Sequence, residues 1–315
     1  MKSIFELCEP RDEVLQGSLS EDIFAARLKD VLDGKGDDVY RMPDKFFENT
    51  FPTSGLRTLV NDALGRLAGD VSGTNAIIRL ETAFGGGKTH NLIALYHLAS
   101  GAVSEKLATR FLNKGLRLPK PGEIKIAGAV GSDQGPTDGV DHPDDGVKTF
   151  TLWGELAYQL GGRAGYALIQ ESEKLRSAPG TSFLETLIGE KPTLIMLDEI
   201  ARQLRSELAV PTATGKTTQA DQTVAFLMSL MEFAASKEHC LVVLTLASQS
   251  DAFASETDMI RENLAEAMRV SARQERVLTP TAENEIYSIV THRLFKKVDR
   301  KSAKQVFEAY ANYLY

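Results

Sequence analysis

Residues 76–99 read AIIRLETAFGGGKTHNLIALYHLA and contain the pattern that decides the fold. A short apolar run comes first, three consecutive glycines follow, and an apolar helical pattern begins at Lys88. A glycine-rich turn between a strand and a helix points backbone N–H groups at one anion, and the helix dipole adds to the attraction. The stretch therefore predicts a phosphate-binding loop, and its candidate binding residues are Phe84, Gly85, Gly86, Gly87, Lys88, Thr89 and His90.

The Gly-Lys-Thr end of this loop has a defined chemistry. In such loops the lysine reaches the β- and γ-phosphates and the hydroxyl ligates Mg²⁺, which are the roles expected of Lys88 and Thr89. One position departs from the full pattern G-x-x-x-x-G-K-[ST], because Thr82 stands where the first glycine is expected. A glycine turn followed by a helix with an exposed lysine is the alternative interpretation. For His90, a packing or capping role is favoured over a phosphate contact.

A second motif, TLIMLDEI, occupies residues 193–200. Its apolar run predicts a buried strand, and Asp198 stands at the carboxyl end, where open α/β sheets bind ligands. We expect Asp198 to hold Mg²⁺ together with Thr89, and Glu199 to orient and deprotonate an attacking water. A strand that ends in surface charge is the bland alternative. That alternative does not explain why both motifs occur in this order, so the glycine-rich loop and the acidic strand together predict a nucleotide site.

The next apolar run, CLVVLTLASQSD at residues 240–251, ends in polar residues. In P-loop ATPases with an additional strand between the loop strand and the acidic strand, the tip of that strand offers a polar group to the γ-phosphate. Ser248 or Gln249 occupies the tip here, whereas Thr245 lies inside the run and is expected to be structural. Arginines that could stabilise transition-state charge follow. The candidates are Arg261, Arg269, Arg273 and Arg276, of which Arg269 and Arg273 share one helical face and are preferred.

Four apolar runs separated by helical patterns predict the architecture. The runs cover residues 76–80, 124–130, 193–197 and 241–246, and the helical patterns lie near 88–100, 103–114, 151–160, 164–176, 199–208 and 219–236. Strands that are apolar on both faces fit a parallel sheet between two helix layers. We therefore predict an α/β fold of the P-loop NTPase type.

Helical segments are expected on both sides of this core. Residues 18–32, where Ser18 and Glu21 are spaced as a capping box, and residues 56–67 predict a helical prefix. No further strand run that is apolar on both faces appears after Ser248, and helices near 256–270 and 281–297 predict a helical lid. The expected domains are therefore a prefix at 1–70, an ATPase core at 71–255 and a lid at 256–315. The apolar stripe in VFEAYANYLY at the end predicts that the lid is truncated.

Composition narrows the class of protein. The 315 residues are 43% hydrophobic and 25% charged, which excludes disorder and a membrane bundle. Cys8 and Cys240 form no CxxC motif, and the N-terminus has no apolar export segment, so the cytoplasm is the expected location. The net charge of −7 confines any contact with DNA to local basic patches. Two such patches are Arg110, Lys114, Arg117 and Lys120, and Arg293, Lys296, Lys297, Arg300, Lys301 and Lys304.

Two other segments are interpreted as loops. Residues 131–146 contain five aspartates among glycine and proline, but their spacing fits no EF-hand, so a solvated loop is favoured over a cation site. The sequence ATGKTT at 213–218 repeats Gly-Lys-Thr at Gly215, Lys216 and Thr217. It follows a helix pattern and lacks the glycine cluster, so we predict that it binds no phosphate.

The chain resembles the AAA+ superfamily of P-loop ATPases, and more narrowly the predicted ATPases of domain of unknown function 499. The segments that carry the resemblance are ELCEPRDEVLQG at 6–17, FFENTFPTSGLRTLV at 46–60, RLETAFGGGKTHNLIALYHLA at 79–99, TLWGELAYQLGG at 151–162, TLIMLDEIARQL at 193–204 and PTAENEIYSIVTHRLF at 280–295. The glycine-rich loop of this family looks like a short TFGGGKTH type, which lacks the first glycine of the full pattern. The resemblance implies roles for Gly85, Gly87, Lys88, Thr89, Asp198 and Glu199.

The same resemblance implies a setting. Such proteins are long and occur in anti-phage defence clusters beside DNA methyltransferase-like and helicase proteins, and relatives act as oligomers with ATP at the interface. The leading hypothesis is Mg-dependent ATP hydrolysis that drives conformational work in a DNA-associated defence complex. The alternatives are a nucleotide-gated scaffold with slow or no hydrolysis that assembles a methyltransferase or effector complex, and a DNA translocase or loader that works through the basic run at 293–304.

Overall fold

The computed structural model describes residues 4–16, 26–82, 87–247, 258 and 275–314. Its centre is a five-stranded parallel sheet with the order β3-β6-β7-β2-β8. The strands are β2 (Ile77–Thr82), β3 (Lys125–Val130), β6 (Thr193–Asp198), β7 (Cys240–Ala247) and β8 (Glu275–Leu278). The predicted α/β class is confirmed, and the fold is compatible with that of P-loop NTPases. The strand β7 lies between β2 and β6, as expected from the sequence.

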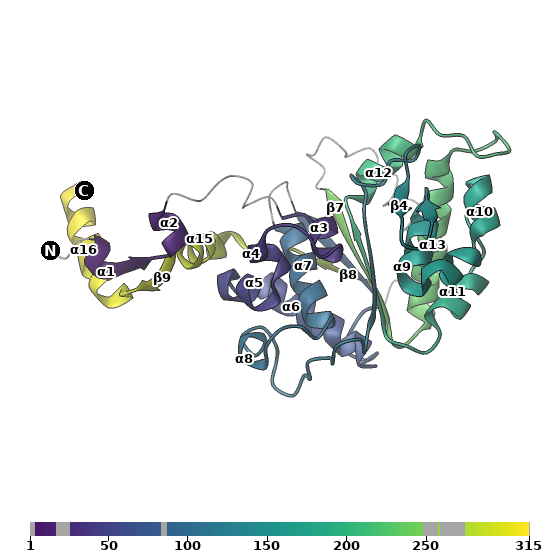
Figure 1. The fold of residues 1–315 in the computed structure, drawn as a ribbon. Coiled ribbons are helices and arrows are strands. Elements are labelled where there is room, and N and C mark those ends of the chain that lie inside the picture. Colours follow the sequence, from purple (N-terminus) through teal and green to yellow (C-terminus); the bar gives the residue numbers. More distant parts are fainter. Residues whose placement is uncertain (1–3, 17–25, 83–86, 248–257, 259–274, 315) are drawn as a thin grey trace.

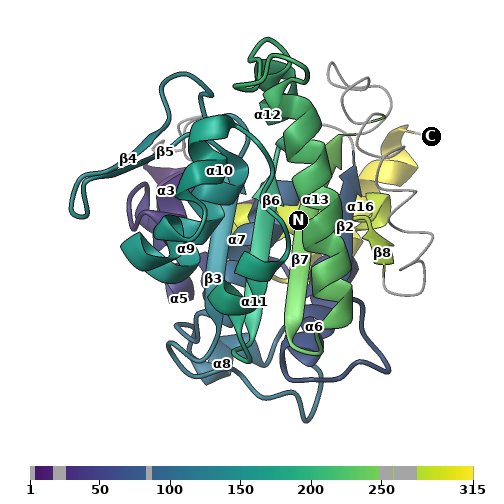
Figure 2. The same cartoon turned by 90° about the vertical axis from the view of Figure 1, so that its right-hand side faces the viewer.

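Two helix layers cover the sheet (Figures 1 and 2). One layer contains α9 (Leu152–Ala167), α10 (Gln170–Leu175), α11 (Ser182–Ile188), α12 (Ile200–Glu207) and α13 (Gln219–Ser236). The other contains α3 (Leu28–Leu32), α4 (Asp38–Arg41), α5 (Pro43–Asn49), α6 (Ser54–Leu67), α7 (Lys88–Ala99) and the short α8 (Glu105–Ala108). Each layer closes one hydrophobic core against the sheet.

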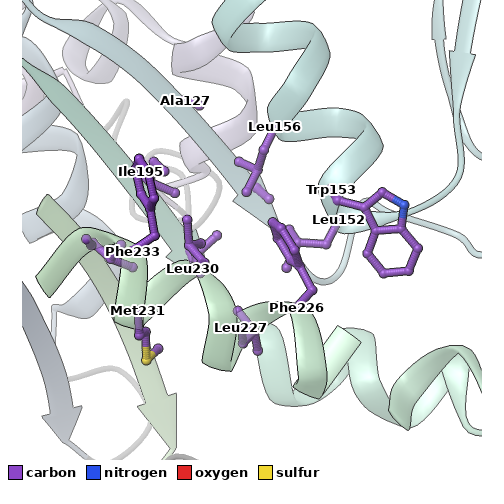
Figure 3. Close-up of a cluster of buried hydrophobic side chains, with 14 of the residues drawn as sticks. Ala127, Leu152, Trp153, Leu156, Ile195, Phe226, Leu227, Leu230, Met231 and Phe233 are labelled. Atoms are coloured by element: carbon purple, nitrogen blue, oxygen red, sulfur yellow. The ribbon is translucent and has the colours of Figure 1, made fainter. Parts of the chain in front are cut away.

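The first core shows why these sequences form buried strands and helices (Figure 3). Trp153 and Leu156 of α9 and Phe226 and Leu230 of α13 belong to one buried cluster with Ile195 of β6. All six residues of β6 are buried, which requires the uninterrupted apolar run seen in the sequence. The Thr218 hydroxyl caps the start of α13 in a capping box.

The chain beyond the sheet differs from the predicted lid. The predicted tail of helices alone is wrong, because β8 joins the sheet and β9 (Phe295–Val298) follows α15 (Ile286–Leu294). The strand β8 is short, lies at the edge and leaves Val277 49% exposed, so it lacks the doubly apolar pattern of a central strand. The predicted helix at 281–297 accordingly ends at Leu294. Of the predicted helix at 18–32, residues 18–25 lie outside the described part, and Leu28–Leu32 form α3. Of the predicted helix at 256–270, only residue 258 is described.

The first residues of the chain pack with the last ones. The elements α1 (Ile4–Leu7), β1 (Cys8–Pro10) and α2 (Asp12–Leu15) lie beside α15, β9 and α16 (Arg300–Leu314) in an arm that extends from the sheet domain (Figure 1). The strands β1 and β9 pair antiparallel, and the Arg11 N–H donates to Leu294 O at 3.0 Å. Side chains of the apolar stripe from Ala309 onward are outside the described part.

Two predicted loops have the following structures. The 131–146 segment turns through several bends and contributes β4 (Val140–His142), which pairs with β5 (Val147–Thr149), so it is only partly a loop. Three of its five aspartates pair with a basic residue or a tyrosine: Asp133 pairs with Arg27, Asp141 with Lys148, and Asp145 accepts from Tyr158. The segment 213–218 is a turn before α13, as expected. In the described segments, no helix has both the length and the apolar composition that a membrane crossing requires.

Candidate functional site

The candidate site lies at the carboxyl ends of β2, β6 and β7. Gly87 ends the glycine-rich loop as the N-cap of α7, with a left-handed backbone (φ 82°, ψ 16°) that favours glycine. Lys88 follows at once, and its Nζ donates to Thr82 O at 2.8 Å, so the side chain reaches back to the end of β2. The other predicted loop residues, Phe84, Gly85 and Gly86, lie outside the described part.

Thr89 and Asp198 meet across the two motifs, 109 positions apart in the sequence. The Thr89 hydroxyl donates to Asp198 Oδ2 at 2.8 Å, and the aspartate is only 2% exposed at the end of β6. Burial raises the pKa of Asp198, while hydrogen bonds from Thr245 and Thr89 and the charge of Lys88 oppose that rise. A hydroxyl and a carboxylate in contact beside a helix N-terminus are a donor set that Mg²⁺ accepts.

Thr245 contacts the candidate site, although the sequence predicts only a structural role for it. Its hydroxyl donates to the second oxygen of the carboxylate, Asp198 Oδ1, at 2.6 Å. The same oxygen atom of Thr245 accepts from the backbone N–H of Glu199 at 3.0 Å. The available signal was a single hydroxyl residue, two positions before the strand end, in an otherwise apolar run.

Glu199 begins α12 in a left-handed conformation (φ 52°), which is unusual for a residue with a side chain. Gly131 makes room for this backbone, because a Cβ at that position would lie 2.1 Å from Glu199 O. The glutamate carboxylate pairs with Arg202 at 3.5 Å, and both side chains are substantially exposed. Glu199 therefore lies next to Asp198 in the chain, but its carboxylate is turned toward its own helix.

Two cavities border the first turn of α7. One, of about 320 Å³, has Arg27, Thr89, Asp198, Glu199 and Arg202 in its lining. The other, of about 530 Å³, touches Thr82 and Gly87 and is lined mainly by apolar side chains. Its walls come from the α4 to α6 region and from α15, and they include Tyr40, Phe51, Leu56, Ile286, Ile289 and Val290. The first turn of α7 thus lies between a polar and an apolar cavity.

His90 contributes to the wall of the apolar cavity. Its Nε2 lies 3.1 Å from Thr50 Oγ1, and its ring packs against Phe46 with 4.6 Å between centroids. Burial, aided by the charge of Arg293, lowers the pKa of His90 to about 4, so the imidazole is neutral near pH 7. These contacts agree with the packing role that the sequence favours.

The remaining predicted residues divide into two groups. Ser248, Gln249, Arg261, Arg269 and Arg273 lie outside the described part. Arg276 is on β8 and pairs with Asp62 of α6, so it contacts no predicted site residue in the described part.

Several residues of the two basic patches have partners within the protein. Arg110 donates to Phe47 O at 3.2 Å, and Arg117 pairs with Glu123. Lys296 pairs with Asp12 of the arm at 2.8 Å. Within the described segments, no group of three or more His, Cys, Asp or Glu side chains is arranged to hold a metal ion.

Comparison with known proteins adds the family. The model of the DUF499 N-terminal domain matches residues 3–277, which is most of the chain, and the chain therefore belongs to the DUF499 family. No curated protein matches the chain. The matched range includes the glycine-rich loop, the acidic strand and β7.

Proposed function

We propose that this DUF499 protein binds ATP with Mg²⁺ and hydrolyses it at the carboxyl edge of the sheet. The observation that carries the proposal is the 2.8 Å contact between Thr89 at the start of α7 and the buried Asp198 at the end of β6. Two motifs that are 109 residues apart converge at one point next to a glycine-capped helix N-terminus. A solvated glycine turn and a strand ending in surface charge would have no reason to meet there.

Each residue has a defined task in this proposal. The N–H groups at the start of α7 and the ammonium group of Lys88 would bind the phosphates once the lysine leaves Thr82 O. Thr89 and Asp198 would hold Mg²⁺, which supplies charge neutralisation at the β- and γ-phosphates. Glu199 would orient and deprotonate water after its carboxylate leaves Arg202. The apolar cavity beside Gly87 has room for the base, and its neutral His90 adds no charge there.

We further propose that the ATPase is of the AAA+ type. Support comes from the position of β7 between β2 and β6, and from α15, which follows the sheet and contributes to the wall of the apolar cavity. We extend the proposal to a cytoplasmic oligomer that performs conformational work in an anti-phage defence complex. Methyltransferase-like and helicase partners are the candidates, and any direct DNA contact would be through basic patches.

Two substitutions test the central proposal. Glu199→Gln is expected to keep Mg-ATP binding and to lower turnover about 100-fold or more, because it removes the general base. Lys88→Ala should weaken ATP binding by roughly 10-fold to 100-fold, since it removes a charged phosphate contact. Calorimetry with Mg-ATP and a steady-state phosphate-release assay measure the two effects.

The chain offers a matched control for the lysine. Lys216 lies in the second Gly-Lys-Thr, which is a turn before α13. Lys216→Ala should leave ATP affinity unchanged. Equal losses in Lys88→Ala and Lys216→Ala, or unchanged turnover in Glu199→Gln, would remove the basis of the assignment.

A nucleotide-gated scaffold is the second candidate, and the contact between Glu199 and Arg202 favours it. A base that pairs with its own helix at 3.5 Å is not directed at the site of Thr89 and Asp198. Such a protein would bind ATP and turn it over slowly. Single-turnover and steady-state rates distinguish the two candidates, because a scaffold would show tight binding with both rates near the uncatalysed level.

A further inference from the structure

The hydroxyl of Thr245 connects the two acidic residues of the candidate site. It donates to Asp198 Oδ1 at 2.6 Å and accepts from the Glu199 N–H at 3.0 Å. We propose that Thr245 is a positioning residue, which sets the carboxylate of Asp198 for Mg²⁺ and the backbone of Glu199 for the attacking water. This inference rests on the proposed ATPase function and deepens it.

The directions of the hydrogen bonds define what the residue does. Asp198 accepts from two hydroxyls, with Oδ2 facing Thr89 and Oδ1 facing Thr245. The two donors approach opposite oxygens of the carboxylate, so together they fix the rotation of that group. The only proton of the Thr245 hydroxyl goes to Asp198, and a lone pair therefore remains for the Glu199 N–H. A hydroxyl performs both tasks, whereas an aliphatic side chain of the same shape performs neither.

The burial of Thr245 is an energetic argument that its hydroxyl has a role. It is 2% exposed on β7, where Leu244 and Leu246 are its apolar neighbours. A buried hydroxyl is costly unless it is hydrogen-bonded, so a valine would be the cheaper residue for packing alone. Here both bonds go to the two residues that carry the proposed chemistry.

The backbone of Glu199 depends on the same contact. Its left-handed conformation (φ 52°) is costly for a residue with a side chain and must be held by its surroundings. The bond from Glu199 N to Thr245 Oγ1 supports it from β7, while Gly131 leaves space for the carbonyl. Thr245 thus joins the strand between β2 and β6 to the residue that would activate water.

The test uses two substitutions at this position and one matched control elsewhere. Thr245→Val removes the hydroxyl at nearly constant shape, and Thr245→Ser keeps it. Thr193→Val removes another fully buried threonine hydroxyl, at the opposite end of β6, where it donates to Lys191 O at 2.8 Å. Nucleotide affinity is measured by calorimetry with ATP in EDTA and across a Mg²⁺ titration, alongside turnover and thermal unfolding.

We expect a specific split between these measurements. In Thr245→Val, ATP affinity in EDTA should stay within about 2-fold, whereas the Mg²⁺ concentration for half-maximal enhancement should rise about 10-fold and kcat should fall about 10-fold to 100-fold. Thr245→Ser should restore both properties. Thr193→Val should match the wild type in both, even if it unfolds at a lower temperature.

Three results would overturn the inference, and one of them concerns the proposed function itself. A wild-type Mg²⁺ response and kcat in Thr245→Val would exclude the positioning role. Equal impairment in Thr245→Ser and Thr245→Val would show that the hydroxyl is not the cause. If the wild-type protein binds no ATP, the proposed function fails, and the inference fails with it.

Discussion

Two buried carboxylates at opposite ends of one helical segment differ in what surrounds them. Asp198 precedes α12 and is 2% exposed, and Glu207 ends α12 and is 1% exposed. Burial raises the pKa of both groups, that of Glu207 to about 7. Burial and a raised pKa therefore do not by themselves distinguish a candidate reactive group from a structural one.

The hydrogen-bond partners of Asp198 and Glu207 distinguish the two carboxylates. Asp198 accepts from two hydroxyls, lies near Lys88 and borders a cavity of about 320 Å³. Glu207 Oε1 accepts from the side-chain amides of Gln203 at 3.0 Å and Gln219 at 2.9 Å, which tie α12 to the start of α13. A carboxylate next to a cavity can exchange its hydroxyl partners for a ligand. A carboxylate enclosed by amides holds two helices together.

The largest effect should come from removing the charge of Asp198. Asp198→Asn is expected to lower ATP turnover roughly 100-fold, because the amide is a poor ligand for Mg²⁺. Glu207→Gln makes the same chemical change outside the site and should leave turnover within about 2-fold, since amides already surround that group. Phosphate release at saturating Mg-ATP measures both. Comparable losses in the two variants would erase the proposed difference between the carboxylates.

The next effect is a gain in stability, whereas the first prediction was a loss of turnover. The pKa of Glu207 rises from 4.5 to about 7 on folding, so the folded state favours the protonated form. The contribution of Glu207 to the free energy of unfolding is therefore fully present below pH 4.5, and it is lost as the pH rises through 7. Glu207→Gln stays neutral and should be more stable than the wild type by about 3 kcal/mol above pH 7, which corresponds to this pKa shift.

Denaturant unfolding at pH 5 and pH 8 checks this prediction. The gain should be small at pH 5 and approach its full size at pH 8. A pH-independent gain would show that packing, rather than ionisation of Glu207, separates the variant from the wild type.

The sequence predicted β2, β3, β6 and β7 well, because each contains an apolar run that is largely buried between the two helix layers. The edge strand β8 escaped prediction for the same reason: with Arg276 paired to Asp62 and Val277 exposed, it has no such run. The pairing of β1 with β9 joins residues almost 290 positions apart. Local periodicity contains no information about such a contact.

In the candidate site, the contact between Thr89 and Asp198 agrees with the expectation from motif order. The role of Thr245 did not follow from the sequence, because its two bonds depend on the register of β7 against β6. The space that Gly131 leaves for Glu199 is also a consequence of three-dimensional packing. The orientation of Glu199 toward Arg202 depends on a helix start that no motif specifies.

A third prediction concerns that space. Gly131→Ala places a Cβ within 2.1 Å of Glu199 O, so the start of α12 must shift. We expect turnover to fall about 10-fold through misplacement of Glu199, with ATP affinity nearly unchanged. Gly180→Ala is the matched control, because a Cβ there meets nothing within 4 Å. Turnover and ATP affinity of both variants test this prediction. Unchanged turnover in Gly131→Ala would show that Glu199 needs no fixed backbone.

The smallest effect should follow removal of Arg202, whose contact with Glu199 is the exposed counterpart of the buried contacts around Asp198. The two side chains are 55% and 41% exposed and 3.5 Å apart, so water and salt screen their attraction. Arg202→Ala should change the free energy of unfolding by less than about 0.5 kcal/mol. Denaturant unfolding at low and at 0.5 M salt, a roughly threefold span in Debye length, measures it. A loss above about 1 kcal/mol that salt abolishes would show that charge at this surface matters as much as the buried carboxylates do.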